Sequence, residues 1–205
     1  MPNETVAGHL SFRDPTRGLL GAFVGFANTN DYDPDTGVDT YAFGGVEGQV
    51  YLGNLTIYAQ AGVAGQIGGA YGGPSSSGGY DPNHEVFAQA TMRFFPQPNT
   101  KLEASIGHID GTIWGTGYPT YDIHALTLAA EVEHQFAAKP FSIFARASGF
   151  ADPGNETGDI SEYSLVAGIR FRLGHFVSLQ DEDRSGTTLK APDLSPVGWT
   201  RWSDY

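Results

Sequence analysis

The sequence has no cysteine, no long apolar run and few basic residues. The absence of cysteine excludes disulfide bonds and thiolate metal sites. No apolar stretch reaches the roughly 18 residues of a membrane-spanning helix, so the sequence predicts none. The 11 Lys and Arg residues face 23 Asp and Glu residues, which gives a formal net charge of -12. This balance excludes nucleic acid as a partner, because nucleic-acid binding requires a basic surface.

The sequence is rich in glycine, with 28 residues, and it repeatedly alternates between two kinds of side chain. Between Thr40 and Leu52, one alternate set is small and apolar, and the other carries aromatic rings, an amide and a carboxylate. A β-strand sends alternate side chains to opposite faces, so such a segment separates two environments. The pattern predicts strands at 5–12, 19–28, 40–52, 55–67, 84–95, 100–112, 124–136, 141–151 and 162–173.

These segments have the length that a tilted strand needs to cross a bilayer, about 9 to 11 residues. Their connections alternate between short and long, and outer-membrane barrels have short periplasmic turns and long extracellular loops. We therefore expect an all-β fold, an antiparallel up-and-down transmembrane β-barrel of about nine visible strands over residues 1–173. Residues 174–205 alternate poorly and are expected to form a flexible periplasmic extension.

The expected strand number is odd, whereas single-chain bacterial barrels normally have an even number. The first expected strand also starts on the extracellular side, and the first ten residues do not resemble a signal peptide. These features predict that at least one N-terminal strand and the signal peptide are missing from this chain. A miscounted strand at 5–12 is the alternative explanation.

The two faces of the expected strands differ in charge. The outward residues, such as Leu20, Ile57 and Leu128, include no Asp, Glu, Lys or Arg. The inward residues include charges of both signs, which predict a ladder in the lumen formed by Glu47, Glu85, Arg93, Lys101, Glu103, Glu131, Glu133, Arg146, Arg170 and Arg172. Buried charges need partners, so a mixed ladder favours a narrow, self-plugged lumen. A polar conduit whose charges select solutes is the alternative.

Two other classes of protein fit parts of the pattern. A soluble, lipocalin-like barrel would also alternate, with its apolar face turned inward around a ligand. A lipid-modifying enzyme of the outer membrane could use Ser105, His108 and Asp110 as a hydrolase triad, but Ser105 and His108 have opposite parity. His84, His108 and His124 could in principle bind zinc, but they are better explained as interface residues. The sequence therefore predicts no catalytic residue, no metal and no cofactor.

Several segments resemble porin-like outer-membrane proteins of Gram-negative bacteria, a family that is largely uncharacterised. They are GHLSFRDP at 8–15, GLLGA at 18–22, VEGQVYL at 46–52 and LTIYAQAG at 55–62. Gly168, Phe171 and Leu173 resemble the signal at which the barrel-assembly machinery recognises outer-membrane strands.

The resemblance implies a location in the bacterial outer membrane, in contact with its lipid and lipopolysaccharide. It implies no catalytic residues. A homo-oligomer, and a periplasmic partner that binds the extension through Trp199 and Trp202, remain open.

Overall fold

The computed structural model describes residues 4–30, 38–68, 84–113, 121–136, 139–151, 161–172, 178–187 and 190–192. These ranges contain nine strands and one short helix, and each predicted strand is present. The elements are β1 (Glu4–Asp14), β2 (Gly18–Asn30), β3 (Val38–Leu52), β4 (Leu55–Gly68), β5 (His84–Gln97), β6 (Thr100–Ile113), β7 (Tyr121–Gln135), β8 (Phe141–Ala151), β9 (Ser161–Phe171) and α1 (Leu179–Ser185).

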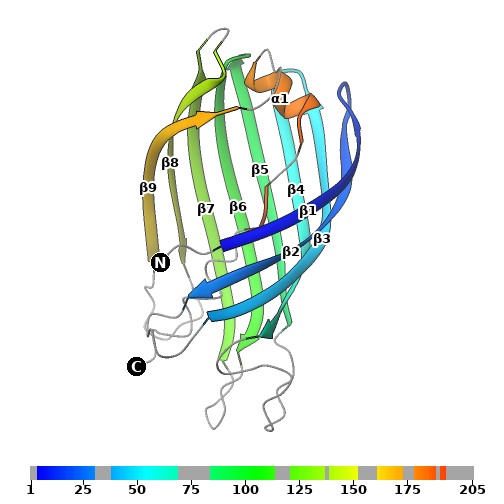
Figure 1. The fold of residues 1–205 in the computed structure, drawn as a ribbon, viewed down its shortest axis with the longest axis vertical. Coiled ribbons are helices and arrows are strands. Elements are labelled where there is room, and N and C mark those ends of the chain that lie inside the picture. Colours follow the sequence, from blue (N-terminus) through cyan, green and yellow to red (C-terminus); the bar gives the residue numbers. More distant parts are fainter. Residues whose placement is uncertain are drawn as a thin grey trace.

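The strands form one antiparallel sheet in which every strand pairs with its neighbours in the sequence, in the order β1 to β9. This confirms the predicted all-β, up-and-down topology. The sheet curls around a concave face, which we call the interior (Figure 1). It is not closed, because no pairing joins β1 to β9 within the described residues.

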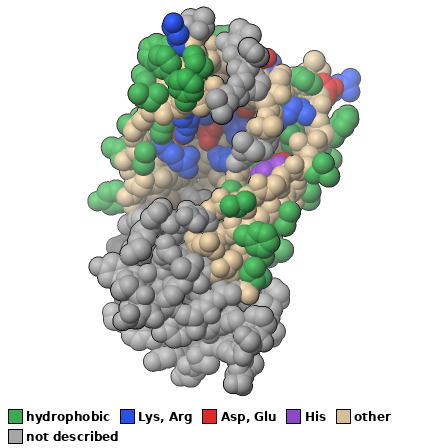
Figure 2. Space-filling model, viewed as in Figure 1, with side chains coloured by type: hydrophobic (Ala, Val, Ile, Leu, Met, Phe, Trp, Pro, Cys, Tyr) green, Lys and Arg blue, Asp and Glu red, His purple; other side chains and the backbone are tan. Residues whose placement is uncertain are grey.

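Alternate residues of each strand lie on opposite faces of the sheet, so the two kinds of side chain that alternate in the sequence are separated in space. Large aliphatic side chains on the convex face are exposed, for example Leu10 at 84%, Leu20 at 72% and Ile169 at 72%. Charged residues of opposite parity are buried on the concave face, where Glu133 is 1% exposed. Figure 2 shows these charges gathered in the hollow, with apolar side chains along the outer surface. The predicted direction of each face is therefore confirmed.

Short turns join the strands at the end of the sheet that also holds α1 (Figure 1). One two-residue turn is Gly53-Asn54, where Gly53 has a φ of 61°, a left-handed conformation that favours glycine. The Asn54 carbonyl then accepts a hydrogen bond from the backbone N–H of Phe95 at 2.8 Å. The turns thus present backbone carbonyls around one mouth of the interior.

The described part of the segment after residue 173 forms a helix against the sheet, and the predicted flexible periplasmic extension stays a prediction. Ser178 caps α1 by accepting a hydrogen bond from the N–H of Asp181, and side chains of the helix contact the inner face of the sheet. Acidic residues of the extension find basic partners on the strands, which strand periodicity alone does not indicate. Among the described residues, no helix is both long and apolar enough to cross a membrane.

Candidate functional site

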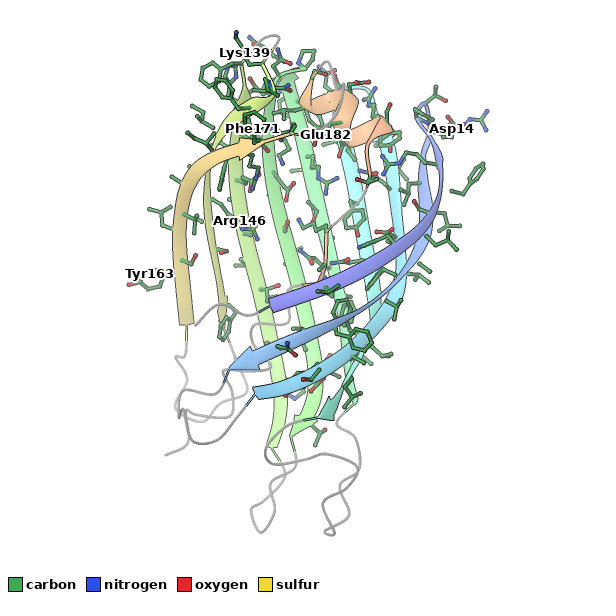
Figure 3. All side chains as sticks on the ribbon, viewed as in Figure 1. Asp14, Lys139, Arg146, Tyr163, Phe171 and Glu182 are labelled. Carbon is green, nitrogen blue, oxygen red and sulfur yellow. The ribbon has the colours of Figure 1, made fainter. Side chains whose placement is uncertain are left out.

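The candidate site is the interior, and its charged part lies near the α1 end of the sheet (Figure 3). Glu133 on β7 is at its centre. Its carboxylate lies 3.1 Å from Lys101 Nζ, 2.8 Å from Arg170 Nη1 and 2.5 Å from Arg172 Nη2. Ser142 Oγ donates a further hydrogen bond at 2.5 Å. One buried carboxylate thus neutralises cations from β6, from β9 and from the residue that follows β9.

Glu131 repeats this arrangement one position further along the inner face of β7. Arg170 donates two hydrogen bonds to its carboxylate, at 2.7 and 2.8 Å, and Lys101 Nζ lies 3.1 Å from the same carboxylate. Arg146 is at the limit of an ion pair, 4.0 Å from the same carboxylate. The Arg170 guanidinium also stacks over the ring of Phe144, 4.0 Å from its centroid. These contacts bring β6, β7, β8 and β9 into one network.

Glu103 extends the network to β5 and to the C-terminal segment. Its carboxylate lies 3.0 Å from Arg93 Nε, 3.5 Å from Lys101 Nζ and 2.8 Å from Lys190 Nζ. Lys190 also donates to the hydroxyls of Thr91 and Ser105, each at 3.0 Å. Burial lowers the pKa of the Lys190 ammonium, although Glu103 opposes this effect. The extension therefore supplies a cation to a position that solvent hardly reaches.

Two residues of the predicted ladder lie outside this ion-pair network. Glu47 accepts a hydrogen bond of 2.7 Å from the Tyr58 hydroxyl and lies 3.1 Å from His9 Nδ1. Glu85 is fully buried near the opposite end of the sheet, beside Gly111. The structure thus brings together the other predicted residues, Arg93, Lys101, Glu103, Glu131, Glu133, Arg146, Arg170 and Arg172.

Apart from Glu85, the half of the interior nearer the long connections is mainly apolar, and the sequence analysis did not predict this grouping. Phe23 packs between Phe43 and Phe87, with ring centroids 6.3 and 6.1 Å apart. The cluster also contains Ala27, Tyr41, Ala64, Ile109 and Ala125. All these residues have inward parity, so the alternation that located the charges could also have located the rings.

Glycines on neighbouring strands make room for these rings. A Cβ on Gly25 would lie 2.4 Å from the Phe43 ring, and one on Gly62 would lie 2.7 Å from the Phe87 ring. These close approaches explain why inward positions that could carry a large side chain carry none. Each ring fills the space above a glycine of the adjacent strand.

Helix α1, also missed, covers the charged end of the interior. The Asp183 carboxylate lies 2.6 Å from Arg93 Nη1 and accepts hydrogen bonds from Gln49 Nε2 and Thr56 Oγ1 at 3.1 and 2.7 Å. Arg172 pairs with Glu182. The sequence did hold one signal, because Ser178 is followed three residues later by Asp181, a spacing typical of helix N-termini.

The enzymatic and metal alternatives gain no support from the geometry. Ser105 lies on the inner face and His108 on the outer face, where His108 Nε2 pairs with Asp110 at 2.9 Å. His124 Nδ1 lies 2.6 Å from the same carboxylate, and the side chain of His84 lies outside the described residues. Within the described ranges, no group of three or more His, Cys, Asp or Glu residues is arranged to hold a metal ion.

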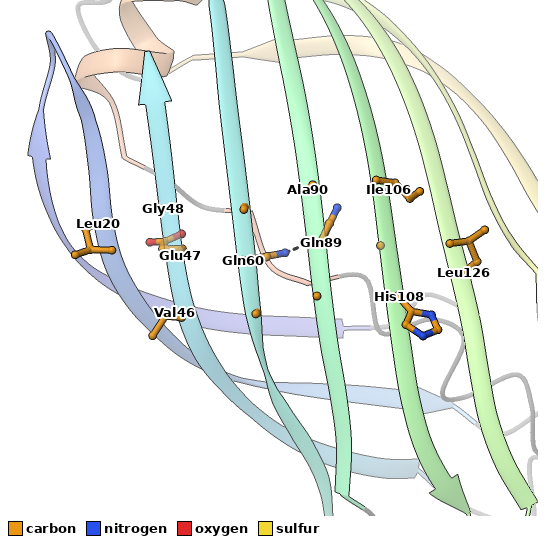
Figure 4. A pocket seen from close by; sticks show the side chains of 14 residues that line it. Leu20, Val46, Glu47, Gly48, Gln60, Gln89, Ala90, Ile106, His108 and Leu126 are labelled. Carbon is orange, nitrogen blue, oxygen red and sulfur yellow. Dashed lines mark hydrogen bonds between the residues drawn. The ribbon is translucent and has the colours of Figure 1, made fainter. Parts of the chain in front are cut away.

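The outer face has a shallow groove of about 600 Å³ over strands β2 to β7 (Figure 4). Small residues such as Ala59, Ala61 and Ala88 form its floor, and Leu20 and Leu126 stand among its lining residues. The groove is a consequence of the small side chains on the central strands. Beneath it, on the inner face, Gln60 donates to Gln89 at 2.7 Å.

The predicted assembly signal is only partly described. Gly168 faces the Phe144 ring, and Phe171 is 70% exposed on the outer face. Leu173 lies outside the described residues. The signal therefore stays a prediction.

No protein-family model, no curated protein and no solved structure matches this chain. The resemblance to porin-like outer-membrane proteins therefore stays a prediction from sequence motifs.

Proposed function

We propose that this chain forms the wall of a porin-like β-barrel in the bacterial outer membrane, with a narrow interior that admits small polar solutes between paired charges. One observation carries the proposal. Large aliphatic residues point outward and are exposed, while acids and bases point inward, where the acids are mostly buried and the bases are half-buried.

The outer face supports contact with hydrocarbon. Exposed apolar residues follow each other across the sheet, for example Val46, Ile57 and Ile106. A contiguous apolar surface of this extent is rare on a protein that is surrounded by water. Lipid would cover it without any rearrangement of the strands.

The interior supports a narrow passage. The carboxylates of Glu131 and Glu133 each bind more than one cation, so their charges are largely satisfied within the protein. A wide aqueous pore would not need such pairing, because water would solvate the charges. Small polar solutes could exchange hydrogen bonds with the ladder as they pass.

The open edges support closure by further strands. The unpaired backbone groups of an open sheet edge are costly in hydrocarbon, so transmembrane sheets close on themselves. We propose that at least one more strand joins β1 to β9. Barrel-assembly machinery, outer-membrane lipid and lipopolysaccharide are the partners of such a barrel.

The two alternatives fit less well. A lipocalin-like barrel requires an apolar interior and a polar outer face, whereas this sheet exposes large aliphatic residues on its outer face and holds ion pairs inside. A hydrolase requires its nucleophile and its base on one side of the wall, whereas Ser105 and His108 are on opposite sides.

Adjacent residues of β7 give a direct test. Thr127 is 7% exposed on the inner face and Leu128 is 54% exposed on the outer face. Each is replaced by cysteine, labelled with a small fluorophore and reconstituted in vesicles that contain brominated lipid. We expect strong quenching at position 128 and weak quenching at position 127.

A chain that stays monomeric in detergent-free buffer and does not float with the vesicles would contradict the membrane assignment. Passage of solutes is tested separately by conductance in planar bilayers, where stepwise currents are expected. A membrane-inserted chain that never conducts would leave only a structural wall.

A further inference from the structure

We propose that the described C-terminal segment, residues 178–187 and 190–192, is a releasable stopper of the interior, held by a carboxylate-binding site on the strands. The site, which we call the latch, consists of Gln49, Thr56 and Arg93. In this structure the Asp183 carboxylate fills it. The inference rests on the proposed barrel, and its ligand class is a small carboxylate that takes the place of Asp183 when the stopper leaves.

The latch has the geometry of a built carboxylate site. Arg93 Nη1 and Gln49 Nε2 approach one oxygen of Asp183 at 2.6 and 3.1 Å, and Thr56 Oγ1 donates to the other at 2.7 Å. Thr56 is fully buried and Gln49 is 3% exposed. The three donors come from three adjacent strands, so the sheet itself positions them.

The stopper is held by polar contacts more than by apolar burial. In α1 only Leu179 is buried. Arg13 donates to the Asp183 carbonyl at 2.6 Å, and Gln180 Nε2 donates to the Gly53 carbonyl at 3.2 Å. Water and solutes can replace polar contacts of this kind, whereas a buried apolar face would hold the helix against exchange.

Release leaves no isolated cation in the wall. Arg93 keeps its ion pair with Glu103 at 3.0 Å when Asp183 departs. Glu103 in turn keeps Lys101 when Lys190 departs. The ladder on β6 to β9 is therefore complete without the stopper, which lowers the cost of opening.

The segment reaches far enough inward to obstruct the passage. Lys190 contacts Glu103 and Ser105 midway along the strands, and Ala191 packs against the aromatic cluster. Figure 1 shows the chain after α1 running from the mouth toward the middle of the sheet. The stopper thus spans the charged half and ends at the apolar half.

A single cysteine beneath the stopper reports its release, because the natural chain has no cysteine. Ser105→Cys is introduced into the full chain in detergent micelles, and its modification by a negatively charged, water-soluble thiol reagent is timed. Asp183→Asn is expected to raise the modification rate about tenfold, since charge-assisted hydrogen bonds to the latch are lost.

Asp14→Asn is the matched control. It makes the same chemical change at the same end of the sheet, in a turn where the Asp14 carboxylate binds Thr16 and Arg17. The control is expected to leave the rate unchanged. Equal rates in the Asp183→Asn and Asp14→Asn chains would overturn the stopper.

A second arm avoids any loss of folding caused by Asp183→Asn. The Ser105→Cys chain with Asp183 intact is treated with sodium acetate or with sodium chloride at the same ionic strength. Acetate is expected to compete with Asp183 for the latch and to accelerate modification. Equal rates in the two salts would overturn the assignment of the latch as a carboxylate site.

Flotation with vesicles separates this inference from the proposed function. A chain that floats but shows no acceleration overturns the stopper and leaves the membrane barrel standing. A chain that does not float but does show acceleration overturns the membrane barrel, while release of the segment stands.

Discussion

The two halves of the interior are built from opposite chemistry on the same strands. Near α1, β6 and β7 carry Lys101, Glu131 and Glu133, which are held by ion pairs of 3.1 Å. Toward the long connections, Phe23 and Phe87 pack with their ring centroids 6.1 Å apart. We call these regions the ionic half and the aromatic half.

The difference shows how one sheet can offer exchangeable hydrogen bonds in one half of its interior and exclude water from the other half. Ion pairs are directional and can transfer their hydrogen bonds to a solute, whereas packed rings exclude water and leave few polar partners. The C-terminal segment follows the same division. Its charged side chains contact the ionic half, and Ala191 contacts the aromatic half. Under the proposed function, selection of a solute would fall to the ionic half.

The largest expected loss of stability comes from a substitution in the ionic half. Glu133→Gln removes the charge that neutralises Lys101, Arg170 and Arg172 in a position that is 1% exposed. We expect the free energy of unfolding to fall by about 3–5 kcal/mol, because a neutral amide does not replace the charge-assisted hydrogen bonds that this buried carboxylate accepts from three cations. Denaturant unfolding of the chain in lipid vesicles measures the loss.

Asp14→Asn, which alters an exposed ion pair, is the control for Glu133→Gln and is expected to leave the free energy of unfolding nearly unchanged. If both substitutions cost the same, the ionic half does not depend on its buried pairs.

The next largest loss of stability is expected from a substitution in the aromatic half. Phe23→Ala opens a cavity between Phe43 and Phe87, and we expect a loss of about 3 kcal/mol in the free energy of unfolding. Phe26→Ala on the same strand is the matched control, since Phe26 is 52% exposed on the outer face. A larger cost at position 26 in detergent would contradict the packing of the aromatic half.

Much of this fold follows from the sequence alone, because a strand has a fixed two-residue period. Residues such as Leu128 and Glu131 differ in parity, and one buried face is enough to fix the register of every strand. The charges of Lys101, Glu131 and Glu133 also predict their own pairing, since a buried charge needs a partner.

The missed features depend on contacts between segments that are distant in the sequence. Asp183 meets Arg93 across 90 residues of chain, and no period links the two. The aromatic half was missed for a different reason. Phe43 and Phe87 share the inward parity of Glu47 and Glu85, but parity alone does not indicate that rings from separate strands gather at one end of the interior.

A smaller effect tests how closely the strands approach in the aromatic half. A Cβ at Gly62 would lie 2.2 Å from the Gly44 carbonyl oxygen, so Gly62→Ala must shift backbone as well as the Phe87 ring. We expect a loss of about 1–3 kcal/mol in the free energy of unfolding. Gly48→Ala on the outer face is the control, because the nearest atom would be 3.7 Å away. A neutral Gly62→Ala would show that the strands separate easily.

The smallest expected effect comes from a substitution that tests whether the ionic half needs the C-terminal segment for its stability. Lys190→Met keeps an unbranched side chain one atom shorter and removes its charge, and Glu103 retains Arg93 and Lys101 as partners. Burial already lowers the pKa of Lys190, so the lost ion pair is offset by a smaller desolvation cost.

We therefore expect Lys190→Met to change the free energy of unfolding by less than about 1 kcal/mol, measured by the same denaturant titration. Glu103→Gln removes the carboxylate and leaves Arg93, Lys101 and Lys190 without this partner. We expect it to lower the free energy of unfolding several times more than Lys190→Met does. A loss at Lys190 as large as that at Glu133 would make the segment a structural part of the ionic half, and a segment of that kind could not leave while the wall stays folded.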